Sequence, residues 1–280
     1  MTIAPNYREA MSAYTSWTVQ DAAERIAVPA TDDDKYSRGV LGVITGSTMY
    51  PGAAVIGVEA ALRTGVGMVR YLGPERAADL VLQRRPEAVI SDGRVQAWLM
   101  GSGMDHVERE SLPHMVAALA QPVPVVLDGG ALDLHSRAGG PVVVTPHFRE
   151  LARLLGADVS DVAADPSAWA RKAADALGVT VLLKGHTTYV AGPGISLSAA
   201  SAPTWLATAG AGDALAGILG ALVATHSREV QDDPTELARL AATAAVVHGL
   251  AAERASAGGP LTVLDLAAAV PATIGALLRG

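Results

Sequence analysis

Short apolar runs alternate with longer amphipathic stretches along most of the chain. The runs have no regular polar face, which is typical of strands buried on both sides, whereas the longer stretches carry apolar residues at helical spacing. The pattern predicts strands at 40–45, 66–72, 88–90, 96–100, 123–128, 141–145 and 179–185. It predicts helices at 52–65, 74–85, 106–120, 148–156, 166–178 and about 210–225, 235–256 and 263–278. Residues 187–200 alternate like a β-hairpin with Gly-Pro-Gly at its turn.

This order of elements predicts an α/β fold with a mostly parallel sheet and helices on both of its faces. No internal repeat and no linker divides the chain, so we expect one domain over residues 35–280. Residues 1–34 are predicted to form an N-terminal helix or arm, with an amphipathic patch at about 19–27. The run Asp32-Asp33-Asp34 at the end of this arm is interpreted as a solvated loop rather than a metal site.

Composition narrows the class of protein further. The chain has 280 residues, a net charge of −7 and 50% hydrophobic residues. No basic run is longer than Arg84-Arg85, which argues against a nucleic-acid or anionic-membrane surface. There is no cysteine, no signal-peptide pattern and no unbroken apolar span, so we expect a soluble cytoplasmic protein without disulfides.

The tract ATAGAGDALAGILGAL at 207–222 places one carboxylate, Asp213, at the start of an otherwise apolar helix. An aspartate is rarely buried without a partner. The small residues before it allow backbone N–H groups to converge at the helix N-terminus as an anion hole, and the positive helix end favours an ionised Asp213. A mere helix-dipole role would not require the glycines. We therefore interpret the turn as a phosphate site and Asp213 as the base that accepts a proton from the attacking hydroxyl.

Other strand ends also carry chemistry-bearing residues, and ligands of such sheets bind beyond the carboxyl ends of the strands. Asp128 follows an apolar run and either serves a ligand or caps the next element. Lys184 ends another buried run and aims an ammonium at the same edge, unless it is a plain surface lysine. His147 and Glu150 share one face near a helix N-terminus, where Glu150 either caps the helix or lies near a magnesium-bound phosphate.

Seven motifs then appear in one order from about residue 35 to 278. They are GSTMYPGA, AALRTGVGMV, GSGM, VVLDGGAL, TPHFRE, LLKG and ATAGAGDALAGILGAL, and AAVVHGLAAERA near the end fits with them. Together they resemble the ADP/ATP-dependent NAD(P)H-hydrate dehydratases, which belong to the ribokinase-like superfamily. The resemblance implies a ribokinase-like three-layer sandwich. It also implies metabolite repair: dehydration of the S epimer of hydrated NADH or NADPH at the expense of ADP or ATP, with Mg²⁺.

The resemblance also assigns residues and partners. Contacts to the hydrated dinucleotide are implied for Ala53, Gly103, His147 and Asp213, the last also being the catalytic base. Nucleotide contacts are implied for Lys184, Gly185, His186, Thr187, Thr188 and Gly212. Glu150 is the candidate magnesium residue. We expect no epimerase domain before this one, a separate NAD(P)H-hydrate epimerase as functional partner, and a homo-oligomer such as a tetramer.

The chain departs from the family pattern in three places. Gly130 stands where a second aspartate is common, Ser102 and Asp105 stand where proline and glycine are usual, and DKYSRG replaces a His-Lys-Gly pattern. A ribokinase-like kinase of the hydroxyethylthiazole or pyridoxine type, or a non-catalytic adenine-nucleotide sensor, would keep much of the same site. A nicotinamide-dependent oxidoreductase is disfavoured, because the G-x-G-x-x-G fingerprint is missing after the first strand.

Overall fold

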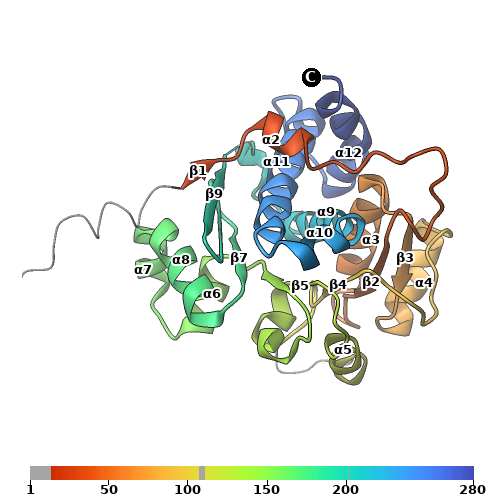
Figure 1. Ribbon diagram of the computed structural model, residues 1–280, viewed down its shortest axis with the longest axis horizontal. Helices are drawn as coiled ribbons and strands as arrows, with labels where there is room; N and C mark the ends of the chain where they lie inside the picture. The colour runs from red at the N-terminus through yellow and green to blue at the C-terminus, as the bar shows by residue number, and fades with distance from the viewer. Residues whose placement is uncertain (1–13, 107–110, 201) are drawn as a thin grey trace, which may run out of the picture.

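The computed structural model describes residues 14–106, 111–200 and 202–280. In this part of the chain nine strands form one sheet in the order β1-β9-β8-β7-β6-β5-β4-β2-β3 (Figure 1). The strands are β1 (Thr15–Ser16), β2 (Val40–Ile44), β3 (Met68–Tyr71), β4 (Ala97–Met100), β5 (Val125–Leu127), β6 (Val142–Val144), β7 (Thr180–Leu183), β8 (Thr188–Gly192) and β9 (Ile195–Ala199).

The sheet is mostly parallel, as predicted. All neighbouring pairs from β3 to β7 are parallel, and the β8–β9 hairpin adds two antiparallel pairings beyond β7. The short β1 in the N-terminal arm then pairs in parallel with β9. Every residue of β2, β4, β5, β6 and β7 is buried, which confirms that these apolar runs are covered on both faces.

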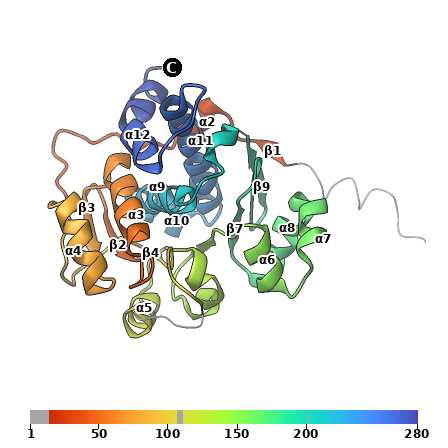
Figure 2. The same ribbon diagram turned by 180° about the vertical axis from the view of Figure 1, so that it is seen from behind.

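Two separate cores show that the molecule has three layers. Leu41 and Val43 of β2 pack into one core, whereas Val40 and Ile44 pack into the other, because alternate residues of a strand point to opposite faces. Figure 2 shows the two groups of helices on either side of the sheet. The first core is closed by α3 (Pro51–Thr64), α4 (Glu75–Arg84), α9 (Ala211–Thr225), α11 (Glu236–Ser256) and α12 (Val263–Leu277). The second is closed by α5 (Leu112–Leu119), the 3₁₀ helix η1 (Gly129–Arg137), α6 (Phe148–Leu155), α7 (Val159–Ala164) and α8 (Pro166–Leu177).

Three smaller elements complete the described chain: α2 (Val19–Ala23), η2 (Thr204–Leu206) and α10 (Ser227–Asp232). The helix α2 and the strand β1 give the N-terminal arm its structure, and the rest of that arm before residue 14 lies outside the described residues. The aspartate run lies in an exposed loop, where Asp33 and Asp34 accept hydrogen bonds from their own turn. No helix of the described residues is long and apolar enough to cross a membrane.

Two sequence predictions were wrong or only partly right. The strand at 88–90 does not form, because only Val89 makes an isolated bridge, to Arg70 of β3. The helix predicted at 106–120 begins at Leu112, with Pro113 in its first turn, and residues 107–110 lie outside the described part. Proline fits a first turn because its missing N–H has no partner there in any case.

Close packing between helices α3 and α9 fixes where the first turn of α9 lies. A side chain at Gly217 of α9 would place its Cβ 2.3 Å from the carbonyl oxygen of Gly57 on α3, so only glycine permits this approach. The two helices lie side by side in both ribbon views (Figure 1 and Figure 2). Asp213 in the first turn of α9 therefore faces α3, and its carbonyl oxygen lies 3.6 Å from the Cβ position of Gly57.

Candidate active site

Four consecutive neighbours in the sheet contribute to one buried hydrogen-bond network at their carboxyl ends. Asp128, just after β5, accepts hydrogen bonds through Oδ1 from Lys184 Nζ at 2.8 Å and from Thr145 Oγ1 at 2.7 Å. Its Oδ2 accepts from Ser102 Oγ at 2.9 Å. Asp128 makes no side-chain cap to η1, so the capping interpretation was wrong, and the carboxylate instead binds side chains of the protein. It acts as the anion that holds the ends of β4, β6 and β7 together.

The Asp128–Lys184 pair is charged although it is buried. Burial opposes ionisation of Asp128, but Lys184 and the two hydroxyl donors outweigh it and lower the pKa of this carboxyl. Burial likewise disfavours the ammonium of Lys184, but Asp128 and Glu150 outweigh it and raise the pKa of the lysine. Glu150 Oε2 lies 3.8 Å from Lys184 Nζ. Lys184 is therefore a site residue between two carboxylates and not a surface lysine.

Within the described residues, the Asp213 carboxyl makes no hydrogen bond to this network, but Asp128 and Lys184 both act on its pKa. It lies in the first turn of α9, after Gly210, which adopts φ 89° in the left-handed region. Burial raises the pKa of Asp213 to about 7, with Asp128 adding to the shift and Lys184 opposing it. The sequence indicated only that the helix end favours the ionised form, and it gave no sign of the desolvation that is the main cause of the raised pKa. A pKa near neutrality suits a general base.

A cavity of about 160 Å³ opens between the end of β7 and the first turn of α9. Five of the six residues predicted to bind nucleotide line it: Lys184, Gly185, His186, Thr188 and Gly212, whereas Thr187 is not part of the lining. A Cβ at Gly212 would lie 3.4 Å from Lys184 Nζ, so the glycine turn and the ammonium face one space. Backbone N–H groups at a helix start and an adjacent cation provide what a phosphate needs.

His248 on α11 also lines this cavity, and the sequence prediction missed it as a site residue. Its side chain is 6% exposed, and its Nε2 has no hydrogen-bond partner among the described residues. Burial lowers the pKa of His248 to about 4, with the Ala211 backbone opposing the shift, so the ring is neutral at pH 7. The signal in the sequence was an imidazole in the middle of an otherwise apolar helix.

Two of the residues predicted to contact the hydrated dinucleotide, Ala53 and Gly103, lie against each other. A Cβ at Gly103 would be 2.3 Å from the Cβ of Ala53, so the loop that carries Gly103 packs on the first turn of α3. Gly103 also has φ +66°, a conformation that favours glycine. Ala53 lies in the first turn of α3, whose Gly57 contacts the backbone of Asp213.

His147 occupies the N-cap of α6 in a capping box with Glu150. The Glu150 backbone N–H donates to His147 Nδ1 at 3.1 Å, and the His147 backbone N–H donates to Glu150 Oε2 at 2.7 Å. The prediction that both side chains share a helical face is thus replaced by reciprocal capping. Because Nδ1 accepts a hydrogen bond, the neutral ring carries its proton on Nε2. The side chain of His147 is 52% exposed, so this N–H is available to a ligand.

Glu150 has limited capacity for a metal. No group of three or more His, Cys, Asp or Glu in the described residues is arranged to hold an ion. One carboxylate oxygen of Glu150 already accepts from His147 and lies near Lys184. Magnesium is commonly bound by one or two carboxylates together with phosphates and water, so this donor set fits a metal that arrives with a nucleotide.

Two departures from the family pattern compensate each other in space. A Cβ at Gly130 would lie 2.6 Å from the carbonyl oxygen of Met104, so the loop 101–105 fills the room that an aspartate would need. Ser102 of that loop is the residue that donates to Asp128. The unusual loop and the missing acid therefore belong to one local arrangement.

The sheet order defines a ribokinase-like fold. A solved ribokinase-like superfamily protein from Enterococcus faecalis shares this fold, with a TM-score of 0.82 at 23% identity over 95% of this chain and 97% of that one. A family model described as NAD(P)H-hydrate dehydratase matches residues 41–270. The chain belongs to the NAD(P)H-hydrate dehydratase family.

Individual relatives agree with this assignment. The chain is 43% identical over 219 residues to a bifunctional NAD(P)H-hydrate repair enzyme of Mycobacterium tuberculosis, covering 73% of this chain and 45% of that protein. It is 35% identical over 215 residues to an ADP-dependent (S)-NAD(P)H-hydrate dehydratase of Neisseria meningitidis, covering 70% and 72%. The Bacillus subtilis ADP/ATP-dependent NAD(P)H-hydrate dehydratase, co-crystallised with ATP and Mg²⁺, superposes with a TM-score of 0.83 at 26% identity, covering 94% and 99%. The chain spans about half the length of the bifunctional relatives.

Proposed function

We propose that this protein dehydrates the S epimer of hydrated NADH or NADPH back to the reduced dinucleotide and consumes ADP or ATP in doing so. The observation that carries the proposal is Asp213, whose pKa is raised to about 7 by burial, in the first turn of α9. That turn closes one side of the cavity that also contains Lys184. Phosphoryl transfer to a hydroxyl requires at least a base and a phosphate-binding turn in one place.

Phosphorylation would convert the ring hydroxyl into a better leaving group. Hydroxide leaves poorly from the hydrated ring, whereas phosphate leaves readily. The ring hydroxyl attacks the terminal phosphoryl group of the nucleotide, its proton passes to Asp213, and the nucleotide leaves with one phosphate fewer. The ring nitrogen lone pair then expels phosphate by breaking the C–O bond, and loss of a proton from the neighbouring ring carbon completes the double bond.

The residues divide into two ligand sites that share Asp213. We assign the nucleotide to the cavity of Lys184 and Gly212, where the glycine turn offers N–H donors to the transferring phosphoryl group. We assign the hydrated ring to the wall made by Ala53 and Gly103, with the exposed His147 Nε2–H as a donor. His186, Thr187 and the hydroxyl of Thr188 complete the proposed nucleotide contacts.

Burial, Asp128 and Lys184 together set the pKa of the proposed base, Asp213. Burial is the main cause of the raised pKa of Asp213, Asp128 raises this pKa further, and Lys184 lowers it. Protonated Asp213 is consequently neutral in a buried place, which favours uptake of the proton. Mg²⁺ would supply further neutralisation of phosphate charge, and Glu150 is the residue that we assign to hold it directly or through water.

The experiment is recovery of NADH absorbance after the protein is mixed with hydrated NADH, Mg²⁺ and either ADP or ATP. We expect NADH to return only when a nucleotide is present, with one inorganic phosphate released per NADH. A phosphorylated product that persists would instead support a small-molecule kinase. Binding of nucleotide without any turnover would support a nucleotide sensor. Running each nucleotide in turn determines which one is preferred.

The proposal extends to partners. The bifunctional repair enzymes in Mycobacterium and related organisms support pairing with an NAD(P)H-hydrate epimerase, which would convert the R epimer for this enzyme.

Large apolar side chains are exposed at the start of α3 and near α9, namely Met49, Tyr50 and Trp205 at 78%, 64% and 49%. Such exposure supports a homo-oligomer, with a tetramer as our expectation, and light scattering after gel filtration tests it.

A further inference from the structure

A second and larger cavity lies at the opposite edge of the sheet from the candidate active site. Its volume is about 760 Å³. Its lining includes Gln96, which directly precedes β4, and Thr225, which ends α9. The active-site groups follow the carboxyl ends of the strands, so the two cavities are separated by the length of the sheet. Neither the proposed reaction nor the family motifs use this second cavity.

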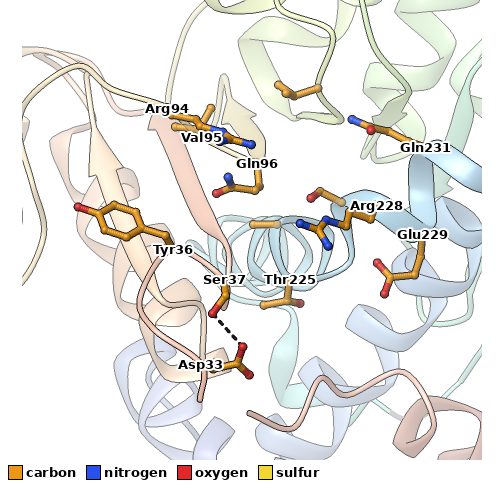
Figure 3. A pocket seen from close by; sticks show the side chains of 13 residues that line it. Asp33, Tyr36, Ser37, Arg94, Val95, Gln96, Thr225, Arg228, Glu229 and Gln231 are labelled. Carbon is orange, nitrogen blue, oxygen red and sulfur yellow. Dashed lines mark hydrogen bonds between the residues drawn. The ribbon is translucent and has the colours of Figure 1, made fainter. Parts of the chain in front are cut away.

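Two arginines point toward one another across the cavity in Figure 3. Arg94 comes from the segment before β4, and Arg228 comes from α10. Neither guanidinium has an ion pair or hydrogen bond with any described residue, unlike Arg63, Arg85 and Arg239, which each pair with a carboxylate. The cavity therefore presents two cations without partners in one space.

Gln96 adds a third donor between them. Its Oε1 accepts a hydrogen bond from the backbone N–H of Val40 at 2.7 Å, which fixes the orientation of the amide. The amide NH₂ group of Gln96 donates to no acceptor among the described residues. Figure 3 places this side chain beside the two arginines. Three donors from two segments, residues 94–96 and α10, thus line one space, and none of them has an acceptor among the described residues.

The two acids that line the cavity, Asp33 and Glu229, do not pair with these donors. Asp33 accepts from the Ala30 backbone N–H at 2.7 Å and from Ser37 Oγ at 2.8 Å, and the first of these bonds leads in lowering its pKa. Its charge is thus engaged within its own turn, as the dashed line in Figure 3 indicates. Glu229 lies beyond Arg228 as seen from Arg94 in the same view. Both arginines are exposed, so their guanidinium groups are open to solvent and to a ligand that enters the cavity.

We propose that this cavity is a ligand site for a small molecule that carries a phosphate group. Guanidinium groups match phosphate oxygens with paired, charge-assisted hydrogen bonds, and a terminal phosphate offers three oxygens to donors on three sides. A phosphate monoester carries about −1.5 to −2 charges at pH 7, which two guanidinium groups match better than the single charge of a carboxylate. The volume of about 760 Å³ leaves room for an organic part of the ligand, on the side of Tyr36, whose ring is 51% exposed.

Titration calorimetry with inorganic diphosphate tests the proposal, because binding is measured without turnover and does not depend on the proposed reaction. We expect wild-type protein to show two classes of site, one of which ADP displaces by competition at the active site. The double variant Arg94→Ala, Arg228→Ala should weaken the other class at least tenfold. Arg254→Ala is the matched control, since Arg254 is an exposed arginine outside this cavity and should change neither class.

Other outcomes decide against the proposal. Unchanged affinity and stoichiometry in the double variant would overturn it, and so would citrate binding at this site as tightly as diphosphate, because citrate carries only carboxylates. The double variant should keep the thermal midpoint and the basal turnover of the wild type, since neither guanidinium has a hydrogen bond or an ion pair with a described residue. A loss of the second class together with an unchanged midpoint would therefore support the site itself rather than a folding effect.

Discussion

Lys184 Nζ donates to Asp128 Oδ1 at 2.8 Å, and this pair joins the ends of β7 and β5 beneath the candidate active site. Both residues act on Asp213, Asp128 raising its pKa and Lys184 lowering it. The pair therefore has two roles: it holds four strand ends in register, and it sets the charge that the proposed base experiences. Several expectations for experiment follow from the geometry of these three residues.

The pH dependence of turnover should report Asp213. Its folded-state pKa is raised from 3.8 to about 7, so the carboxylate that acts as base is present only above that pH. We expect kcat/KM for the hydrate to rise with pH through a midpoint near 7 and then to level off. A profile that is flat from pH 5 to 8 would contradict the assignment of Asp213 as the base.

Replacement of Asp128 by asparagine should move that midpoint. The substitution removes a negative charge that raises the pKa of Asp213 and leaves Lys184 with Glu150 as its remaining carboxylate, and both changes lower the pKa of Asp213. We expect the ascending limb of kcat/KM to shift to lower pH. Stability should also fall, because the ammonium loses its hydrogen-bonded carboxylate and keeps only Glu150 at 3.8 Å. Thr145→Val removes only one donor to Asp128, and this control should leave the midpoint near 7.

Replacement of Lys184 by methionine should weaken nucleotide binding and destabilise the fold. The ammonium lines the proposed phosphate cavity and also neutralises Asp128, whose exposed fraction is only 4%. We expect at least a tenfold rise in the Kd for ADP and a loss of about 3–5 kcal/mol in unfolding free energy. Lys172→Met on α8, where the lysine lies over Trp169, is the control and should keep full ADP affinity. Unaltered ADP binding by the Lys184 variant would remove this residue from the site.

Replacement of Gly103 by alanine should damage the hydrate site and spare the nucleotide site. The new Cβ would fall 2.3 Å from the Cβ of Ala53, so the loop or α3 must move. We expect KM for the hydrate to rise severalfold with an unchanged Kd for ADP. Gly156→Ala has a similar φ of +63° but nothing within 4 Å of the new Cβ, so it should cost only the left-handed strain of about 1–2 kcal/mol. Equal kinetic effects of the two variants would contradict a steric role for Gly103.

The sequence was sufficient to predict the strands of the sheet and most of the strand-end residues. Each buried strand is a distinct apolar run, and the polar residue that follows the run can be identified directly. Lys184 and Asp128 were identified in this way. Their pairing was not, since 56 residues separate them and only the strand order brings them together. The strand at 88–90 was predicted wrongly because three apolar residues give the same sequence pattern whether they pair along a whole strand or make a single bridge to it.

The charge state of the site lay beyond the sequence for a physical reason. A helix N-terminus is visible as a pattern, and it favours an ionised Asp213. Desolvation depends on what packs around the carboxyl, and it raises the pKa of Asp213 in a way that the sequence pattern does not indicate. His248 was overlooked for the same reason, since the sequence does not indicate that its imidazole is buried with Nε2 unpartnered among the described residues.

The central claim is that Asp213 takes the proton from the hydroxyl that attacks the nucleotide. The most direct measurement compares Asp213→Asn with the wild type in NADH recovery and in ADP binding on the same preparations. We predict a loss of about 10²–10⁴-fold in turnover, the usual contribution of a general base, with ADP affinity nearly unchanged. Turnover at the wild-type rate in this variant would contradict the account.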